Sequence, residues 1–382
     1  MRRVLKDHGL GFLVAIVLCV LLEGLLQLAV LAKGGRSVDE PPYGPSADLG
    51  WERLPGFQGR VADKERAFDR DGYLTIDSAQ VADTAARRVL FVGDSNTFGY
   101  GVRMEETFAE ATERALPGVA AINVGAQGYS SYQGRVALSR HLARIRPSAV
   151  VASFNFNDRR YVFPGQEDGA ARMAALASAS PLESLASFRF GRLLLSKTTA
   201  SREINVTTVR PRVDEAAYRR NLTAIAEMCQ RAGIPLIFVL LRDNPVQTYH
   251  LRQGLAALER GEHGMAVAHL SVAATTANWF QALARLHLAE AYRRRNQPTA
   301  DAERYTPPWP VNSSMGALPI RMEHGYHAAM RDVARVYEIP VVDAPAQPDE
   351  YIDFCHVNPA GHARIGHHVA RQLTRLLARR SS

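Results

Sequence analysis

The stretch RVLFVGDSNTFGYG, residues 88–101, decides how this chain folds. Its first part, residues 88–93, is a short run of β-branched, apolar and aromatic residues, which predicts a buried strand. Gly93, Asp94 and Ser95 follow directly. A serine at the point where a strand ends and a helix begins is exposed at the sheet edge, among backbone N–H groups that favour negative charge. Ser95 is therefore a candidate nucleophile, although the same pattern suits a serine that only caps the following helix.

The same alternation of short apolar runs and longer amphipathic stretches continues to the C-terminus. Further strands are predicted at 119–125, 148–154, 234–241 and 339–344. Helices are predicted near 106–116, 132–146, 214–232, 322–337 and 359–379. This order is typical of a parallel sheet covered by helices. We expect an α/β fold, a three-layer α/β/α sandwich with a five-stranded parallel sheet, in which functional groups gather at the carboxyl ends of the strands.

Two segments depart from this rhythm. Residues 159–213 carry Ala- and Ser-rich pieces and no clear strand, so an irregular insertion is predicted there. Residues 249–305 are predicted to be helical. Small and apolar residues fall there at the offsets of a tetratricopeptide (TPR) helix pair, namely Gly254, Ala257, Gly261, Ala266, Leu270 and Ala273. Because only about one and a half units are present, an ordinary helical hairpin explains the pattern as well as a TPR-like peptide-binding module.

The N-terminus carries a membrane signal. Residues 9–32 are almost continuously apolar, which is long enough for a helix to cross the roughly 30 Å hydrocarbon layer, with Glu23 and Gln27 as interruptions. Basic residues precede this run, so the N-terminus is expected to stay in the cytoplasm. We predict an uncleaved signal anchor that spans the cell membrane once and leaves the rest of the chain on the extracytoplasmic side. A cleaved signal peptide is the alternative.

These features divide the chain into five predicted parts. They are a transmembrane signal anchor at 1–33, a linker and lead-in at 34–84, the first part of the α/β domain at 85–248, the TPR-like helical insertion at 249–305 and the second part of the α/β domain at 306–382.

Composition excludes several classes of protein. The chain has 382 residues, with 46 Lys and Arg against 38 Asp and Glu, so its net charge is +8. This surplus suits an anionic membrane or an acidic polysaccharide. No Lys/Arg-rich block is present, so nucleic acid is not expected as a partner. Three cysteines without a C-x-x-C pair predict neither a disulfide framework nor a zinc site.

A second chemical motif lies near the C-terminus, where Asp353-Phe-Cys-His356 precedes a predicted helix. An aspartate three residues before a histidine can hold the imidazole in one tautomer, while the imidazole takes a proton from a serine. The alternative is a solvated loop acid with a surface histidine. A metal site that uses His356 and His362 is less favoured, because no further ligand completes a known spacing.

At these residues the chain resembles the SGNH/GDSL hydrolases, which have a flavodoxin-like fold. The family's four sequence blocks find counterparts in the right order. The resemblance implies that Ser95 is the nucleophile, that Asp353 and His356 complete a triad, and that Ser95, Gly128 and Asn157 form the oxyanion hole. Gly125 is a less favoured alternative to Gly128.

Two supporting residues and one departure belong to the same resemblance. Asp94 and Asp158 are expected to support the first and third blocks. Where the family's third block commonly has a glycine, this chain has Asn155, which predicts a larger side chain near the pocket wall. Leu49-Gly-Trp51 and Arg70-Asp-Gly-Tyr73 resemble the lead-in of membrane-anchored bacterial members.

The resemblance implies an exported, membrane-tethered serine esterase that removes O-acyl groups, such as acetyl, from an envelope glycan or lipid without a cofactor. An O-acyltransferase of a cell-surface polysaccharide with the same triad is an alternative. A non-catalytic envelope scaffold that presents the TPR-like helices to a protein partner is another.

Overall fold

The computed structural model of this protein describes residues 17–28, 42–74, 87–162, 187, 202–204, 210–276, 280–295, 309–311, 320–343 and 346–378. Residues 17–28 form a helix inside the predicted membrane segment. Within the described part of the chain, no helix combines the length and the apolar character that crossing a bilayer requires. The rest of the predicted signal anchor, and most of the predicted insertion at 159–213, lie outside the described residues.

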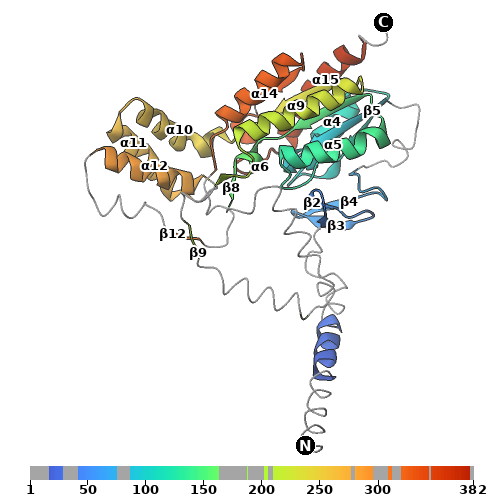
Figure 1. The fold of residues 1–382 in the computed structure, drawn as a ribbon, viewed down its shortest axis with the longest axis horizontal. Coiled ribbons are helices and arrows are strands. Elements are labelled where there is room, and N and C mark those ends of the chain that lie inside the picture. The colour runs from blue at the N-terminus through green and yellow to red at the C-terminus, as the bar shows by residue number, and fades with distance from the viewer. Residues whose placement is uncertain are drawn as a thin grey trace, which may run out of the picture.

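A five-stranded parallel sheet forms the centre of the molecule (Figure 1). In chain order its strands are β5 (Arg87–Gly93), β6 (Val119–Asn123), β7 (Ala149–Ser153), β11 (Leu236–Leu240) and β13 (Val341–Asp343). In space they follow the order β6-β5-β7-β11-β13, which is the 2-1-3-4-5 order of flavodoxin-like sheets. The predicted number, positions and parallel direction of the strands are confirmed.

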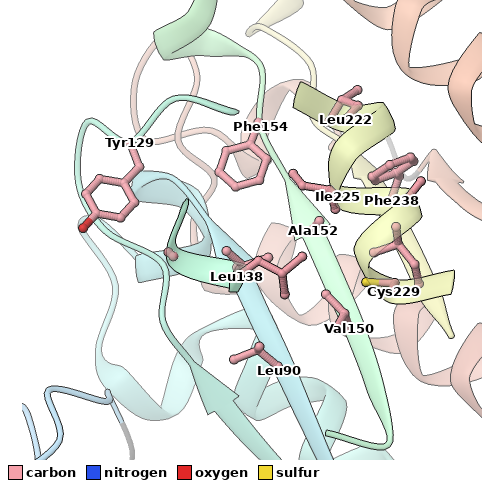
Figure 2. Close-up of a cluster of buried hydrophobic side chains, with 14 of the residues drawn as sticks. Leu90, Tyr129, Leu138, Val150, Ala152, Phe154, Leu222, Ile225, Cys229 and Phe238 are labelled. Carbon is pink, nitrogen blue, oxygen red and sulfur yellow. The ribbon is translucent and has the colours of Figure 1, made fainter. Parts of the chain in front are cut away.

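Helices cover both faces of this sheet. They are α5 (Ser131–Ile145), α9 (Glu215–Arg231) and α14 (His324–Val336) on one face, and α4 (Phe108–Ala115) and α15 (Pro359–Ala378) on the other. Successive strand residues point to opposite faces. Val150 and Ala152 of β7 therefore pack with Leu138 and Ile225 on the first face, as Figure 2 shows, whereas Val151 packs on the second. The predicted three layers are present.

Residues 42–74 are packed onto the sheet domain rather than leading away from it. They form two hairpins, β1 (Tyr43–Ser46) with β2 (Gly50–Arg53) and β3 (Gln58–Val61) with β4 (Lys64–Ala67). The buried guanidinium of Arg53 donates to the carbonyl of Asn123 at 2.7 Å, and that of Arg66 donates to the carbonyl of Gly99 at 2.5 Å. This part of the predicted linker and lead-in thus belongs to the folded body.

Three helices form a lobe beside the sheet (Figure 1). They are α10 (Pro245–Glu259), α11 (His263–Thr275) and α12 (Gln281–Arg294). A Cβ atom on Gly254 of α10 would lie 2.5 Å from Cγ of Leu270 in α11, so only glycine allows these helices to approach as they do. The apolar core of this lobe also contains Phe156 and Cys355 of the α/β domain. Close pairing of α10 and α11 suits either a TPR unit or a plain hairpin, so the TPR-like character stays a prediction.

Short strands also occur where none was predicted. Residues 159–213 contain β8 (Tyr161–Val162), which pairs with β10 (Arg210–Pro211), and β9 (Arg202–Ile204). The partner of β9 is β12 (Trp309–Val311), which lies outside this segment. The segment was expected to carry no clear strand, and its described part contains three short ones. These strands have two or three residues each, too few to produce an alternating pattern that sequence reasoning can recognise.

Candidate active site

Ser95 lies at the carboxyl end of β5 and begins the short helix α3 (Ser95–Phe98). This edge lies between β5 and β7, where the strand order reverses and where open α/β sheets bind their ligands. Asp94 fixes the turn, because its carboxylate accepts the N–H of Asn96 at 2.9 Å. Burial raises the pKa of Asp94 to about 6, although the hydrogen bond from Asn96 acts in the opposite direction. The supporting residue Asp94 therefore acts on the backbone next to Ser95.

His356 lies between Ser95 and Asp353. Its Nε2 atom is 2.7 Å from Oγ of Ser95, and its Nδ1 atom is 2.7 Å from Oδ2 of Asp353. The other carboxylate oxygen, Oδ1, accepts the backbone N–H groups of Cys355 at 2.9 Å and His356 at 2.8 Å. Burial raises the pKa of Asp353, but the hydrogen bonds from His356 and from these N–H groups outweigh it, and the net pKa is lowered. The structure brings the three predicted residues into one hydrogen-bonded relay.

Aromatic rings lie against the imidazole of His356, whose side chain is 11% exposed. The Tyr100 ring centroid lies 4.5 Å away at an interplanar angle of 34°, and the Phe354 ring lies edge-on at 6.0 Å. These contacts limit rotation of the imidazole, so its orientation depends on packing as well as on Asp353.

Gly128 lies on the loop that follows β6, and the side chain of Asn157 contacts the same loop at Tyr129. Gly128 has a φ of +75°, a conformation that favours glycine. The Nδ2 group of Asn157 donates to the carbonyl of Tyr129 at 3.1 Å, which orients the amide and leaves its second N–H for another acceptor. The backbone N–H of Gly125 donates to Oδ1 of Asn123 at 2.9 Å. Gly125 therefore has its donor occupied within the protein, which favours Gly128 as an oxyanion donor.

The lead-in hairpin holds the Gly128 loop in place. The backbone carbonyl of Gln127 accepts a hydrogen bond from Nε1 of Trp51 at 3.1 Å. The backbone N–H of Gln127 donates to the hydroxyl of Tyr43 at 2.8 Å. A Cβ atom on Gly128 would lie 3.2 Å from the Trp51 ring. The guanidinium of Arg212 donates to the Gly128 carbonyl at 2.5 Å. Sequence reasoning missed Tyr43 and Arg212, because no local motif marks a residue that reaches the loop from a distant segment.

Asn155 does not form a pocket wall. Its Nδ2 group lies 2.8 Å from Nε2 of His327 and donates to the carbonyl of Leu241 at 3.1 Å, and its Oδ1 atom accepts from Nε of Arg159 at 2.9 Å. Arg159 forms a fully buried ion pair with Asp243. The prediction for Asn155 was therefore wrong: its side chain points into the interior and joins the ends of β7 and β11.

Asp158 connects the third block to a helix of the sheet domain. Its carboxylate accepts the N–H of Ser131 at 2.9 Å and the Ser131 hydroxyl at 2.5 Å, at the first residue of α5. A carboxylate is favoured at a helix N-terminus. Asp158 thus fixes the segment that carries Asn157 against α5, which is how it supports the site.

One group of metal-ligating side chains occurs in the described part of the chain. The ligand atoms of Asp353, Cys355 and His356 all lie within 4.8 Å of one another. Both imidazole nitrogens of His356 already contact Asp353 and Ser95, and burial raises the pKa of the Cys355 thiol far above its usual value. His362 accepts the N–H of Phe108 at 3.2 Å through Nδ1. These contacts favour proton transfer over metal binding at His356.

Comparison with known proteins gives similarity in structure alone. No protein-family model matches the chain, and no curated protein matches it in sequence. The fold is similar to an alpha/beta hydrolase from the metagenome of Lake Arreo, Spain, at 12% identity and a TM-score of 0.38 over 75% of this chain and 94% of that one. It is also similar to the lipase/acylhydrolase from Enterococcus faecalis, at 15% identity and a TM-score of 0.36, over 75% of this chain and 95% of that one. A third similar structure is a GDSL-like lipase from Bacteroides thetaiotaomicron, at 12% identity and a TM-score of 0.38, over 78% of this chain and 95% of that one. Because these values are low, the case for a function rests on the geometry of this chain.

Proposed function

We propose that this protein is a serine esterase of the SGNH/GDSL type. The observation that carries the proposal is the 2.7 Å contact between Oγ of Ser95 and Nε2 of His356, whose other ring nitrogen contacts Asp353. This is the arrangement in which an imidazole removes the proton of a serine hydroxyl, while a carboxylate holds the required tautomer. A structural helix cap does not require a histidine aligned in this way.

In the proposed reaction, Oγ of Ser95 attacks the ester carbonyl while His356 takes its proton. The carbonyl oxygen then becomes an oxyanion. The leaving alcohol receives the proton from His356, and an acyl-Ser95 remains. Water, activated by His356 in the same way, releases the carboxylic acid and restores the serine.

Three donors are proposed to stabilise the oxyanion. They are the backbone N–H groups of Ser95 and Gly128 and the side-chain amide of Asn157. The positive φ of Gly128, its contact with Trp51 and the bond from Asn157 to the Tyr129 carbonyl support this assignment, because they hold the donors in place before substrate arrives. Donors that need no reorganisation lower the barrier most.

The substrate is proposed to be an O-acyl ester, such as an acetyl ester, on a cell-envelope glycan or lipid. The apolar run 9–32 and its basic flank support a protein that is tethered to the cell membrane with its α/β domain on the extracytoplasmic side. There the enzyme would act on envelope components close to the bilayer.

Labelling by a fluorophosphonate probe tests the nucleophile. Wild-type protein should label and should hydrolyse p-nitrophenyl acetate, whereas Ser95→Ala should do neither. Ser139→Ala, which removes an exposed serine on α5, is the matched control and should behave as wild type. Equal labelling of wild type and Ser95→Ala would show that the nucleophile is assigned wrongly.

Acyl transfer uses the same intermediate, because a sugar hydroxyl can replace water in attacking acyl-Ser95. Hydrolysis and acyl transfer are distinguished by measuring the carboxylic acid released and the mass of the glycan product in the same reaction. Acid release that is unchanged by added glycan acceptor indicates an esterase. An acylated glycan that forms at the expense of acid release indicates a transferase.

A further inference from the structure

A groove of about 520 Å³ lies beside the proposed oxyanion loop. It is lined by α5, the strand β10 and the first turns of α9, through Tyr132, Arg210, Arg212, Asp214, Arg220 and Asn221. Its volume is in the range of natural ligand sites, about 300–1,000 Å³. None of these residues belongs to the proposed triad or oxyanion hole, so the groove needs its own explanation.

The charged residues that line this groove are mostly cationic. Arg210, Arg212 and Arg220 stand against one carboxylate, Asp214, whose Oδ1 atom already accepts the N–H of Ala217 as the cap of α9. Clefts lined by one sign of charge concentrate the electrostatic potential and attract ions of the opposite sign. The groove therefore favours an anionic occupant.

Arg210 and Arg220 are exposed, and within the described residues neither forms an ion pair. Nearby arginines differ in this respect: Arg219 pairs with Asp332 at 2.8 Å, and Arg321 contacts Glu215 at 3.3 Å. The guanidinium groups of Arg210 and Arg220 therefore face solvent at the same groove, whereas the neighbouring arginines are paired with acidic side chains.

Arg212 joins the groove to the proposed active site. Its guanidinium donates to the Gly128 carbonyl at 2.5 Å and to Oε1 of Gln133 at 2.6 Å, and it lies 5.2 Å from the Trp51 ring centroid. At the other side of the groove, Asn221 donates to the hydroxyl of Ser131 at 3.0 Å. Through Arg212, the groove is therefore connected to the loop that carries Gly128.

We propose that this groove binds carboxylate or phosphate groups on a saccharide whose acyl ester is presented to Ser95. The inference rests on the proposed esterase function and narrows its substrate to an anionic glycan. Guanidinium groups match the planar, two-oxygen geometry of carboxylates and phosphates and bind them through paired hydrogen bonds. A neutral glycan would leave these charges without a counterpart.

Binding is measured on the full chain carrying Ser95→Ala, so that turnover does not alter the ligand. The probes are a hexagalacturonate, a phosphorylated mannopentaose and the neutral maltohexaose, each titrated by calorimetry at low and at physiological salt. The anionic probes should bind, more weakly at the higher salt, and the neutral probe should not. Adding Arg210→Gln and Arg220→Gln should weaken binding about tenfold or more, because hydrogen bonds to charged groups are lost.

The matched control is Arg371→Gln with Arg375→Gln, two exposed arginines on α15 at the opposite face of the sheet. It removes the same net charge and should leave binding unchanged. Preference for one anionic probe assigns carboxylate or phosphate as the natural group. The proposal is overturned if no anionic probe binds, if the neutral probe binds equally well, or if both double variants weaken binding alike. Fluorophosphonate labelling of Ser95 in the wild type tests the esterase proposal separately. The esterase proposal and the proposal of an anionic glycan in the groove can therefore fail independently.

Discussion

The Oγ atom of Ser95 lies 2.7 Å from Nε2 of His356, although 261 positions of the chain separate the two residues. The serine follows the strand β5, and the histidine lies on the loop before α15. Because both loops leave the same edge of the parallel sheet, the sheet order brings their side chains together. The consequences of this geometry can be measured.

Asp353→Asn should lower kcat for p-nitrophenyl acetate by about 10³- to 10⁴-fold, because an amide next to Nδ1 of His356 stabilises the wrong tautomer. The KM should change little. Asp349→Asn, an exposed acid four positions earlier, is the control and should retain full activity. A loss smaller than tenfold in Asp353→Asn would mean that this carboxylate does not orient the base.

Asn157→Ala should lower kcat about 10²- to 10³-fold with little change in KM, because an oxyanion donor acts in the transition state and hardly at all in the ground state. Steady-state kinetics measure both parameters. Circular dichroism checks that the bond to the Tyr129 carbonyl is not needed for folding. A raised KM with unchanged kcat would assign Asn157 to substrate binding instead.

Tyr100→Ala should reduce kcat about tenfold, a loss of about 1.4 kcal/mol, because the ring that faces the His356 imidazole at 4.5 Å no longer limits its rotation. Tyr100→Phe keeps the ring and should restore the rate. If both variants lose activity equally, the hydroxyl matters and the ring contact does not.

Two glycines in the helical lobe should respond in opposite ways to the same substitution. Gly254→Ala should destabilise the protein by about 1–3 kcal/mol, because the new methyl group overlaps Leu270. Gly264→Ala should be neutral or stabilising by about 0.4–1 kcal/mol, because its Cβ would meet nothing within 4 Å. Urea unfolding of the full chain measures both changes. Equal effects would contradict the close packing of α10 and α11.

His362 should make the fold sensitive to acid. Burial lowers the pKa of His362 to about 3, from about 6.5 in an unfolded chain. The unfolded state therefore binds the extra proton between these values, so this contribution to stability is complete above about pH 6.5 and is lost as the pH falls toward 3. His362→Asn keeps an acceptor for the N–H of Phe108 but cannot titrate. Its Tm should fall less steeply than that of the wild type between pH 6.5 and 4; parallel curves would refute this role.

Much of the fold could be predicted from local sequence. Apolar runs and amphipathic stretches located the five sheet strands and the five covering helices, because burial on a sheet or along a helix imposes a periodicity on neighbouring residues. The strands β8, β9 and β10 were missed, because pairs of two or three residues leave no such period. The membrane anchor and the TPR-like character of α10–α12 stay predictions.

The sequence by itself determined that Ser95 follows a buried strand and that Asp353 precedes His356 by three residues, since turn chemistry and short spacings depend on neighbouring positions in the chain. Only the tertiary structure decided that Asn155 points inward, that Gly125 has its N–H occupied, and that Arg212 reaches the Gly128 carbonyl. Those facts depend on which distant segments pack together, and packing is a property of the whole folded chain rather than of any stretch within it.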